Sequence, residues 1–287
     1  MSFFKGFNQE LKLILSLRVG AFLCLLGWAW VHFYWEAPYA ILVWNETVFS
    51  WVERGGGDWE KFVGTGSNDG LLQQVVRQLF WIFLIAAAAS FAARKCSIWK
   101  LIALLMGSLF LIILFYARYL ESQQQLPILI EHGGQVLMPI ILVLALKFGP
   151  RFSFTQHVAI LAVMLTFTGH GAYALGLWPT PANYFAMTKL ILGLDFEASV
   201  VFLKIAGVMD FLICVGFLFT KLRRVSAGYA FCWGLLTALA RPLAGMSFDL
   251  HYWGADQFIH EAMLRAPHFM VPLYLLVLWH PVSEHET

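Results

Sequence analysis

Two stretches of the sequence align without a gap, Val75–Lys95 (VVRQLFWIFLIAAAASFAARK) and Phe202–Leu222 (FLKIAGVMDFLICVGFLFTKL). The alignment places Arg77 on Lys204, so each stretch carries a cation near one end, then a long apolar run, then basic residues. A helix that crosses a bilayer needs about 20 mostly apolar residues, and both stretches are that long. The pair therefore predicts a membrane fold built from repeats, whose halves meet around shared polar positions.

The composition indicates an integral membrane protein. Hydrophobic residues make up 60% of the 287 residues, charged residues only 13%, and the mean hydropathy is +0.71. A soluble domain has about 45–50% apolar and about 25% charged residues. The net charge of +2 comes without a basic arm, so nucleic acid is not expected as a partner.

The apolar runs predict an all-α bundle with eight membrane spans. The spans are Leu11–Trp35, Leu72–Ala93, Ile98–Ala117, Ile128–Leu146, Phe154–Leu177, Ser199–Phe219, Val225–Leu243 and Gln257–Trp279. Short basic connections mark the cytoplasmic side. They follow the second, fourth and sixth spans and contain Arg94, Lys95, Lys100, Lys147, Arg151, Lys221, Arg223 and Arg224. We therefore expect both termini in the cytoplasm and a multi-pass protein of the inner cell membrane.

The spans predict two four-helix repeats, over residues 1–150 and 151–287. Spans three and seven end in FYARYL and ALARPL, which places Arg118 on Arg241. Spans four and eight contain LMPIILVLAL and MVPLYLLVLW, which places Pro139 on Pro272. An even number of spans in each repeat makes the repeats parallel, related by an axis along the membrane normal.

The longest outer connection is predicted over residues 36–70. Its apolar part, Ala40–Trp51, is expected to form an interfacial helix with tryptophans at the depth of the lipid headgroups. The glycine-rich part that follows, GGGDWEKFVGTGSNDG, is expected to be a flexible loop.

Ionisable residues within the spans are the candidate functional residues, because charges at membrane depth are costly and usually face a protein interior or a wet cavity. The candidates for acid–base catalysis are Asp210, His170, Glu131 and His132. The candidates for ligand binding are Lys204, Arg77, Arg118, Arg241, Glu261, Arg265 and His268. In the alignment of the repeats Asp210 falls opposite Phe83 and His170 opposite Trp28, which predicts that the chemistry is in the second half.

Structural roles compete with each of these functional ones. Long arginine side chains near helix ends reach the headgroups by extending along the helix. Glu261 and Arg265 are four residues apart and can pair along their own helix. Asp210 and Lys204 are six residues apart, so they do not share a helix face, and each is expected to have a partner on another helix.

A haem or metal site is the weaker interpretation of the histidines. His132, His170, His260 and His268 could converge on the outer side, and histidine is the usual ligand of both groups. However, the sequence contains no HExxH or CxxCH spacing. It contains no GxSxG motif of a serine hydrolase either, and the last span has no lysine for a retinal Schiff base.

The second half resembles the DoxX/DoxD-like membrane family. The stretch Phe202–Arg241 looks like that family's second and third helices, with the pattern Ala-Gly-Val-Met-Asp at residues 206–210, and Thr166–Gly176 (TFTGHGAYALG) looks like its first helix. The resemblance covers about half of the chain. It implies a four-helix unit and a loose link to quinone redox chemistry, because some members resemble subunits of thiosulfate:quinone oxidoreductase and others accompany redox-stress enzymes. This chain departs from the family in having eight predicted spans and a long outer loop.

Three functions remain open at this point. The first is an oxidoreductase acting with a quinone, or its membrane subunit, with an outward-facing pocket for an anionic or quinone-like ligand. The second is a non-catalytic scaffold or anchor in a larger membrane complex, with the tryptophan-rich outer loop contacting other membrane or extracytoplasmic subunits. The third is a transporter of a small solute coupled to protons.

Overall fold

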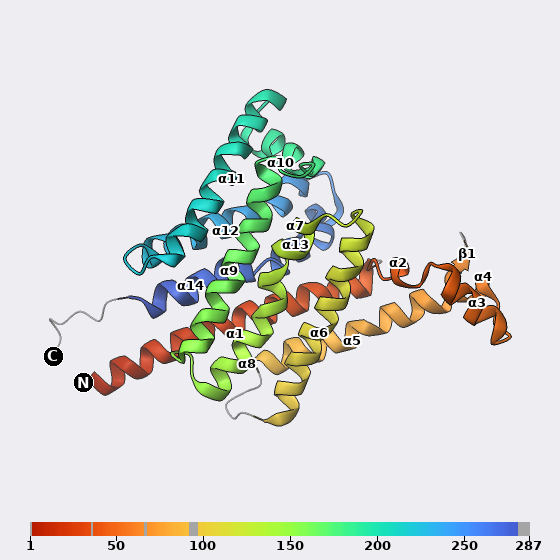
Figure 1. Cartoon of the computed structure of the whole chain (residues 1–287), viewed down its shortest axis with the longest axis horizontal. Coiled ribbons are helices and arrows are strands. Elements are labelled where there is room, and N and C mark those ends of the chain that lie inside the picture. The colour runs from red at the N-terminus through yellow and green to blue at the C-terminus, as the bar shows by residue number, and fades with distance from the viewer. Residues whose placement is uncertain (1, 36, 66–67, 92–96, 281–287) are drawn as a thin grey trace.

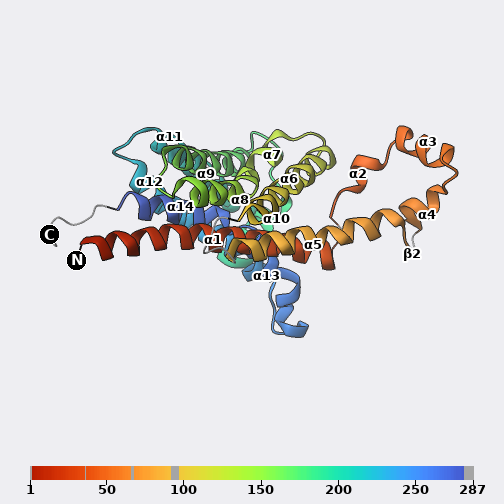
Figure 2. The same ribbon diagram turned by 90° about the horizontal axis from the view of Figure 1, so that it is seen from below.

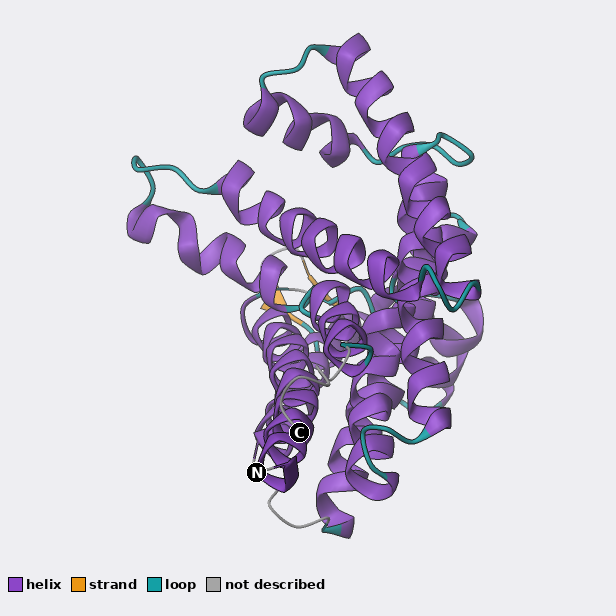
Figure 3. Cartoon of the chain, turned by 90° about the vertical axis from the view of Figure 1, so that its left-hand side faces the viewer, coloured by secondary structure: helices purple, strands orange, loops and turns teal. Residues whose placement is uncertain are grey.

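The computed structural model describes residues 2–35, 37–65, 68–91 and 97–280, with side chains from residue 9 onward. Helices dominate this part of the chain (Figures 1 and 3). The longer ones are α1 (Ser2–Tyr34), α5 (Leu71–Phe91), α6 (Ile98–Glu121), α8 (Gly133–Phe148), α9 (Ser153–Ala174), α10 (Ala182–Leu192), α11 (Phe196–Leu218), α12 (Arg223–Gly245) and α14 (Pro267–Leu278). Arg94 and Lys95, which belong to a predicted basic connection, lie outside the described residues.

The described helices fit an all-α membrane bundle. Six spans are long and apolar enough to cross a membrane, and the number rises to seven if the bent pair α13 (Ala255–Met263) and α14 is one span. The six are Gln9–Tyr34, Leu71–Phe91, Ile98–Glu121, Leu126–Phe148, Ser153–Ala174 and Phe196–Leu218. The remaining predicted span corresponds to α12, which has 23 residues but is less apolar than these.

Apolar side chains cover the outside of the bundle. On α5, Trp81 and Ile85 are each more than half exposed, and on α11 the same holds for Ile205 and Leu212. Soluble monomers rarely expose apolar surface of this extent. The surface is therefore that of a protein surrounded by lipid.

Two of the predicted spans are broken. The fourth consists of α7 (Leu126–Glu131) and α8, which meet at His132. The eighth consists of α13 and α14, which are bent by 50° over the residues between Met263 and Pro267. Proline lacks a backbone N–H and fits the first turn of a new helix, so α14 begins at Pro267. Each was predicted as one span. Leu126–Phe148 is still long and apolar enough to cross a membrane as one unit, whereas the eighth span is divided by the bend.

The two halves of the chain pack in matching ways. Helix α1 packs on α5 as α9 packs on α11, and α6 packs on α8 as α12 packs on α14. Helix α8 packs on α9, the first helix of the second half, and α14 packs on α1, the first helix of the chain. The N-terminal end of α1 and the C-terminal end of α14 lie at the same end of the bundle (Figures 1 and 2).

The connections at the opposite end hold more structure than the sequence predicted. The expected interfacial helix at residues 40–51 is two helices, α2 (Ala40–Val43) and α3 (Glu46–Arg54), because Asn45 caps α3 by accepting a hydrogen bond from the Val48 N–H at 3.1 Å. After α4 (Trp59–Val63), the expected flexible loop contains a two-stranded antiparallel hairpin, β1 (Gly64–Thr65) and β2 (Asn68–Asp69). These elements extend beyond the bundle (Figure 2).

Two further helical segments complete this end. Helix α10 fills the connection between α9 and α11, which was predicted as loop. A short 3-10 helix, η1 (His251–Gly254), precedes α13. Helix α10 packs on both α11 and α12, so it forms a lid over the end of the second half.

Candidate functional site

Ionisable side chains from both halves meet near the interruptions of the two broken spans, at His132 and between Met263 and Pro267. They come from α6, α7, α9, α10, α12, α13 and α14 and the breaks between these helices. We call this group the polar cluster; it consists of Arg118, Glu131, His132, His170, Tyr184, Arg241, Glu261, Arg265 and His268. It contains most of the residues that the sequence singled out, although they are separated by up to 150 positions.

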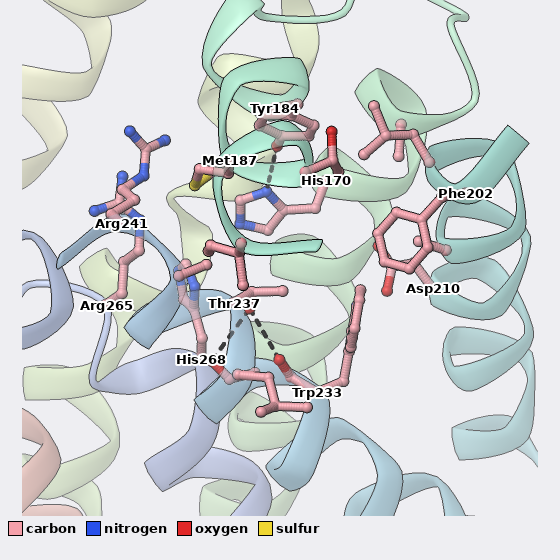
Figure 4. A pocket seen from close by; sticks show the side chains of 18 of the residues that line it. His170, Tyr184, Met187, Phe202, Asp210, Trp233, Thr237, Arg241, Arg265 and His268 are labelled. Carbon is pink, nitrogen blue, oxygen red and sulfur yellow. Dashed lines mark hydrogen bonds between the residues drawn. The ribbon is translucent and has the colours of Figure 1, made fainter. Parts of the chain in front are cut away.

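A carboxylate, an imidazole and a phenol share one point of the cluster. His170 Nδ1 lies 2.8 Å from the Tyr184 hydroxyl and 3.3 Å from Glu131 Oε2. Glycine allows this contact, because a Cβ at Gly169 would lie only 2.4 Å from the Glu131 backbone nitrogen. Helices α7 and α9 therefore approach closely enough to hold Glu131 beside His170 (Figure 4 shows the Tyr184–His170 bond).

Tyr184 stays protonated in this surrounding. Burial raises the pKa of the Tyr184 phenol well above its ordinary value, and the Glu131 carboxylate adds to the shift. Tyr184 is therefore a group that can share its proton with His170 by hydrogen bonding.

Two more histidines adjoin this point. The ring of His268 lies edge-on to the ring of His170, with 5.1 Å between the ring centres. His132 is buried against Phe115 at 4.1 Å between ring centres, and its Nδ1 donates to the Ile128 carbonyl at 2.7 Å. Glu131 Oε1 is 3.7 Å from His132 Nδ1. His132 is thus held in place by its own helix turn, whereas His268 is not.

Glu261 joins two arginines. The guanidinium of Arg265 donates to the Glu261 carboxylate one helical turn away and to the Glu261 carbonyl oxygen at 2.6 Å. Arg241 Nε, from another helix, lies 3.9 Å from the same carboxylate. The sequence allowed a pair along one helix. The structure adds the contact across helices, so Glu261 also ties α12 to α13.

Arg118 is different from these arginines. Its guanidinium lies over the Trp28 ring, 5.4 Å from the ring centre, which is cation–π geometry. No ion pair within 4.0 Å is found for it among the residues that the structure describes. Trp28 is itself fixed by donating from its indole N–H to Gln135 Oε1 at 2.8 Å.

An apolar cavity of about 280 Å³ lies on one side of the cluster, within the second half. We call it the apolar cavity. Aromatic and aliphatic side chains such as Phe202, Trp233 and Met187 form most of its wall. Its polar lining consists chiefly of His170, Tyr184, Asp210, Arg241, Arg265 and His268. Figure 4 shows His268 and the two arginines on one side of the cavity and Asp210 on the other.

Two polar atoms of this cavity lack a partner. Asp210 Oδ1 and His268 Nε2 are buried and make no hydrogen bond with the described part of the chain. The Trp233 side chain is the hydrogen-bonding neighbour of the Asp210 carboxyl group. Helices α12 and α14 approach closely beside His268, since a Cβ at Gly234 would lie 2.2 Å from the His268 carbonyl oxygen.

A second cavity, of about 520 Å³, lies on the other side of the cluster. We call it the polar cavity. Its charged lining consists of Arg118, Glu131, Arg241, Glu261 and Arg265. Asn183 Oδ1 and His260 Nδ1 are its buried atoms without a hydrogen-bond partner among the described residues. Tyr184, Arg241 and Arg265 line both cavities and so form the wall between them.

Two predicted residues lie elsewhere. Lys204 is exposed on α11 and lines neither cavity, because Asp210 on the same helix faces inward and Lys204 is on a different face. Arg77 is exposed near the start of α5 and pairs with Asp69 of β2 at 2.8 Å. The expectation that these two cations supply charge to the pocket is not met.

Other lining residues were missed in the sequence. Tyr184 and Asn183 lie on α10, and the signals for that helix were present: Pro181 precedes it, and Gly193 ends it with a left-handed φ of 68°. Trp233 and Thr237 lie one turn apart on α12, and they carry no signal that separates them from ordinary core residues.

No group of three or more His, Cys, Asp or Glu side chains in the described residues is placed to share a metal ion. The histidines of the cluster are instead spread over both cavities. Comparison with protein-family models, with curated proteins and with solved structures finds no match to this chain.

Proposed function

We propose that the protein binds an amphiphilic, quinone-like ligand in the apolar cavity and acts as a quinone-linked membrane oxidoreductase or as its membrane subunit. One observation carries the proposal: Asp210 and His268 present unpartnered buried polar atoms from two sides of a cavity that is otherwise mostly apolar. Burying polar atoms without partners is costly, so a ligand with matching groups would be stabilised there. A para-quinone has that form, with an apolar ring and oxygen atoms at its two ends.

The cluster offers ways to move protons at such a ligand. A quinone bound in the cavity would supply reversible reduction by two electrons and two protons. His170 lines the cavity and its Nδ1 lies 3.3 Å from Glu131 Oε2, so a proton can pass between the ring and that carboxylate, while the Tyr184 hydroxyl holds the ring by hydrogen bonding. Asp210 can exchange a proton at the other side of the cavity. The electrons would come from a redox protein that docks on the chain, which is why a role as a subunit is included.

The proposal includes the repeat and the topology. The alignment that places Pro139 on Pro272 also places His132 on Arg265, and both of these residues lie at helix breaks. The matching packing of the two halves supports two four-helix repeats with eight spans. The start of α1 and the end of α14 lie at one end of the bundle, which supports an even number of spans, and the short basic connections favour the cytoplasm of a cell with an inner membrane for that side. Membership of the DoxX/DoxD-like family is part of the same proposal.

The first test is quinone binding by the purified protein. One sample of the detergent-solubilised protein is extracted with organic solvent, and the extract is analysed by mass spectrometry for bound quinone. In a second sample, a short-chain quinone is titrated into the protein and binding is measured by calorimetry. Ala206 lines the apolar cavity, so we expect Ala206→Phe to fill it and weaken quinone binding by at least about tenfold. Ile205, the neighbouring residue, is 60% exposed, so Ile205→Phe is the matched control and should bind normally.

The proton role is tested separately at one position. Asp210→Asn keeps the shape of the side chain but cannot release a proton. We expect it to bind quinone and to support reduction by a chemical donor at a rate lowered by about 10²–10⁴-fold, the usual worth of a positioned acid or base. Lys204→Gln, on the exposed side of the same helix, should leave the rate unchanged. Equal rates for both variants would remove Asp210 from the mechanism. Failure of the unmodified protein to bind quinone would refute the proposal.

A transporter is the second candidate, because of the broken spans. Transporters commonly bind substrate where helices are discontinuous near the bilayer midplane, at the interface of repeats. Here the α7–α8 and α13–α14 breaks both adjoin the polar cluster. Proton flux that depends on an added solute, measured in vesicles containing the pure protein, would favour this function.

A further inference from the structure

The polar cavity has the features of a second binding site, separate from the apolar one. We propose that it binds a small monovalent carboxylate, whose planar group carries two equivalent oxygen atoms, next to Arg118. This inference concerns the other side of the Tyr184–Arg241–Arg265 wall. It therefore stands whether or not the apolar cavity binds a quinone.

The charge of the lining is the first argument. Three arginines and two glutamates line the polar cavity, so the fixed charges leave an excess of one positive charge. Glu261 already contacts Arg241 and Arg265, and Glu131 is directed toward His170 and His132. Protonation of a histidine would add to the excess and could not reverse its sign. With both glutamates ionised, a single anionic charge completes the balance.

Arg118 is the second argument, because it is where the excess lies. It has no carboxylate partner among the described residues and holds its guanidinium over Trp28. Guanidinium groups bind planar oxygen pairs through two parallel N–H donors, which favours a carboxylate over a spherical ion. Trp28, which is fully buried and bonded to Gln135, holds the guanidinium beside the cavity by cation–π contact.

Unpartnered polar atoms are the third argument. His260 is buried, lines the cavity, and has no hydrogen-bond partner for Nδ1, while Asn183 Oδ1 from the lid helix α10 is also buried without one. The ring of His260 faces Trp35 with 6.2 Å between ring centres. A ligand that carries its oxygen pair toward Arg118 and a polar substituent toward these atoms would satisfy both sides of the cavity.

The test uses acetate as the probe and the full chain in detergent. Apparent midpoints of thermal unfolding are measured with increasing sodium acetate, with sodium chloride replacing it at constant ionic strength, and bound acetate is measured directly by equilibrium dialysis. We expect saturable stabilisation by acetate that chloride and sulfate do not match. Arg118→Gln should weaken acetate binding by about 10–100-fold, the worth of a charge-assisted hydrogen bond pair. Arg118→Lys keeps the charge but loses the two parallel N–H donors, so its acetate affinity should lie between those of Arg118→Gln and the unmodified protein.

Two controls separate this site from folding and from the quinone site. Arg77→Gln removes an exposed arginine far from the cluster and should bind acetate like the unmodified protein. Ala206→Phe should lose quinone and keep acetate. The inference fails if acetate stabilises no more than chloride, if sulfate binds more tightly than acetate, or if folded Arg118→Gln retains full acetate affinity.

Discussion

The close approach of α7 and α9 at Gly169 gives a prediction that can be worked from the structure. A Cβ added at Gly169 would lie 2.4 Å from the Glu131 nitrogen and 2.6 Å from the Glu131 Cα. Ordinary contact begins at 3.4 Å, so the two helices must separate by about 1 Å. The obstructing atoms are backbone and cannot rotate away. We expect the cost of overpacking to be near 3 kcal/mol, the upper end of its usual range.

The gain in helix propensity offsets part of this cost. Alanine is better than glycine in a helix interior by about 0.8–1.0 kcal/mol, so the net destabilisation of Gly169→Ala is about 2 kcal/mol. For a chain of this size that corresponds to a midpoint lower by about 4–8 °C. The same shift moves Glu131 away from His170, now 3.3 Å apart, so quinone reduction should fall as well.

The assay is thermal unfolding in detergent, with Gly228→Ala as the control. Gly228 is also within a helix, but a Cβ there would meet only Leu276, at 3.8 Å. Without overpacking, the propensity gain should raise or preserve the midpoint. If Gly169→Ala matched or exceeded the unmodified protein in stability, the contact between α7 and α9 described above would be refuted.

Three further predictions concern charged and hydroxyl groups. Glu261→Gln leaves Arg241 and Arg265 facing each other without their shared carboxylate, and because Glu261 is 30% exposed we expect a loss of about 1–3 kcal/mol in unfolding free energy, measured by denaturant titration. Asp69→Asn breaks an exposed pair with Arg77 and should cost under about 1 kcal/mol by the same measurement; a larger loss would show that the hairpin supports α5. Tyr184→Phe removes the hydrogen bond to His170 and should cost about 0.5–1.5 kcal/mol. Because the pKa of Tyr184 is raised in the folded protein, its stabilising contribution is complete below the unfolded pKa of about 10 and is lost as the pH rises above it. The midpoint of thermal unfolding should therefore fall less steeply above pH 10 for Tyr184→Phe than for the unmodified protein.

The sequence identified the helices well because a membrane span leaves a strong signal. About 20 apolar residues in a row define a span, and the predicted starts of most spans lie within a few residues of the observed helices. The break at His132 left no such signal, since a run of apolar residues looks the same whether its helix is continuous or broken, whereas Pro267 marks the start of α14. Short α10 was missed for a related reason: its 11 residues are fewer than a span needs.

The sequence predicted most of the residues of the candidate site but not which of them contact each other. An ionisable residue in an apolar run is expected to face inward, and Glu131, His170 and Asp210 do. That rule failed for Arg77, which lies near the start of α5, where a long side chain can reach water or headgroups, and for Lys204, which lies on the exposed face of α11. The contact between Glu131 and His170 depends on Gly169, and no local pattern indicates which helix lies opposite a glycine.

The helix breaks explain why so many polar groups can gather in a membrane bundle. In a continuous helix the backbone N–H and C=O groups bond to each other, so only side chains can contribute to a polar site. At a break the helix is interrupted, so residues there can face a common point. His132 and Arg265 occupy equivalent positions in the two aligned halves, and each lies at such a break. The two breaks therefore carry different side chains. An imidazole stands at one break and a guanidinium at the other, and both side chains line the polar cavity.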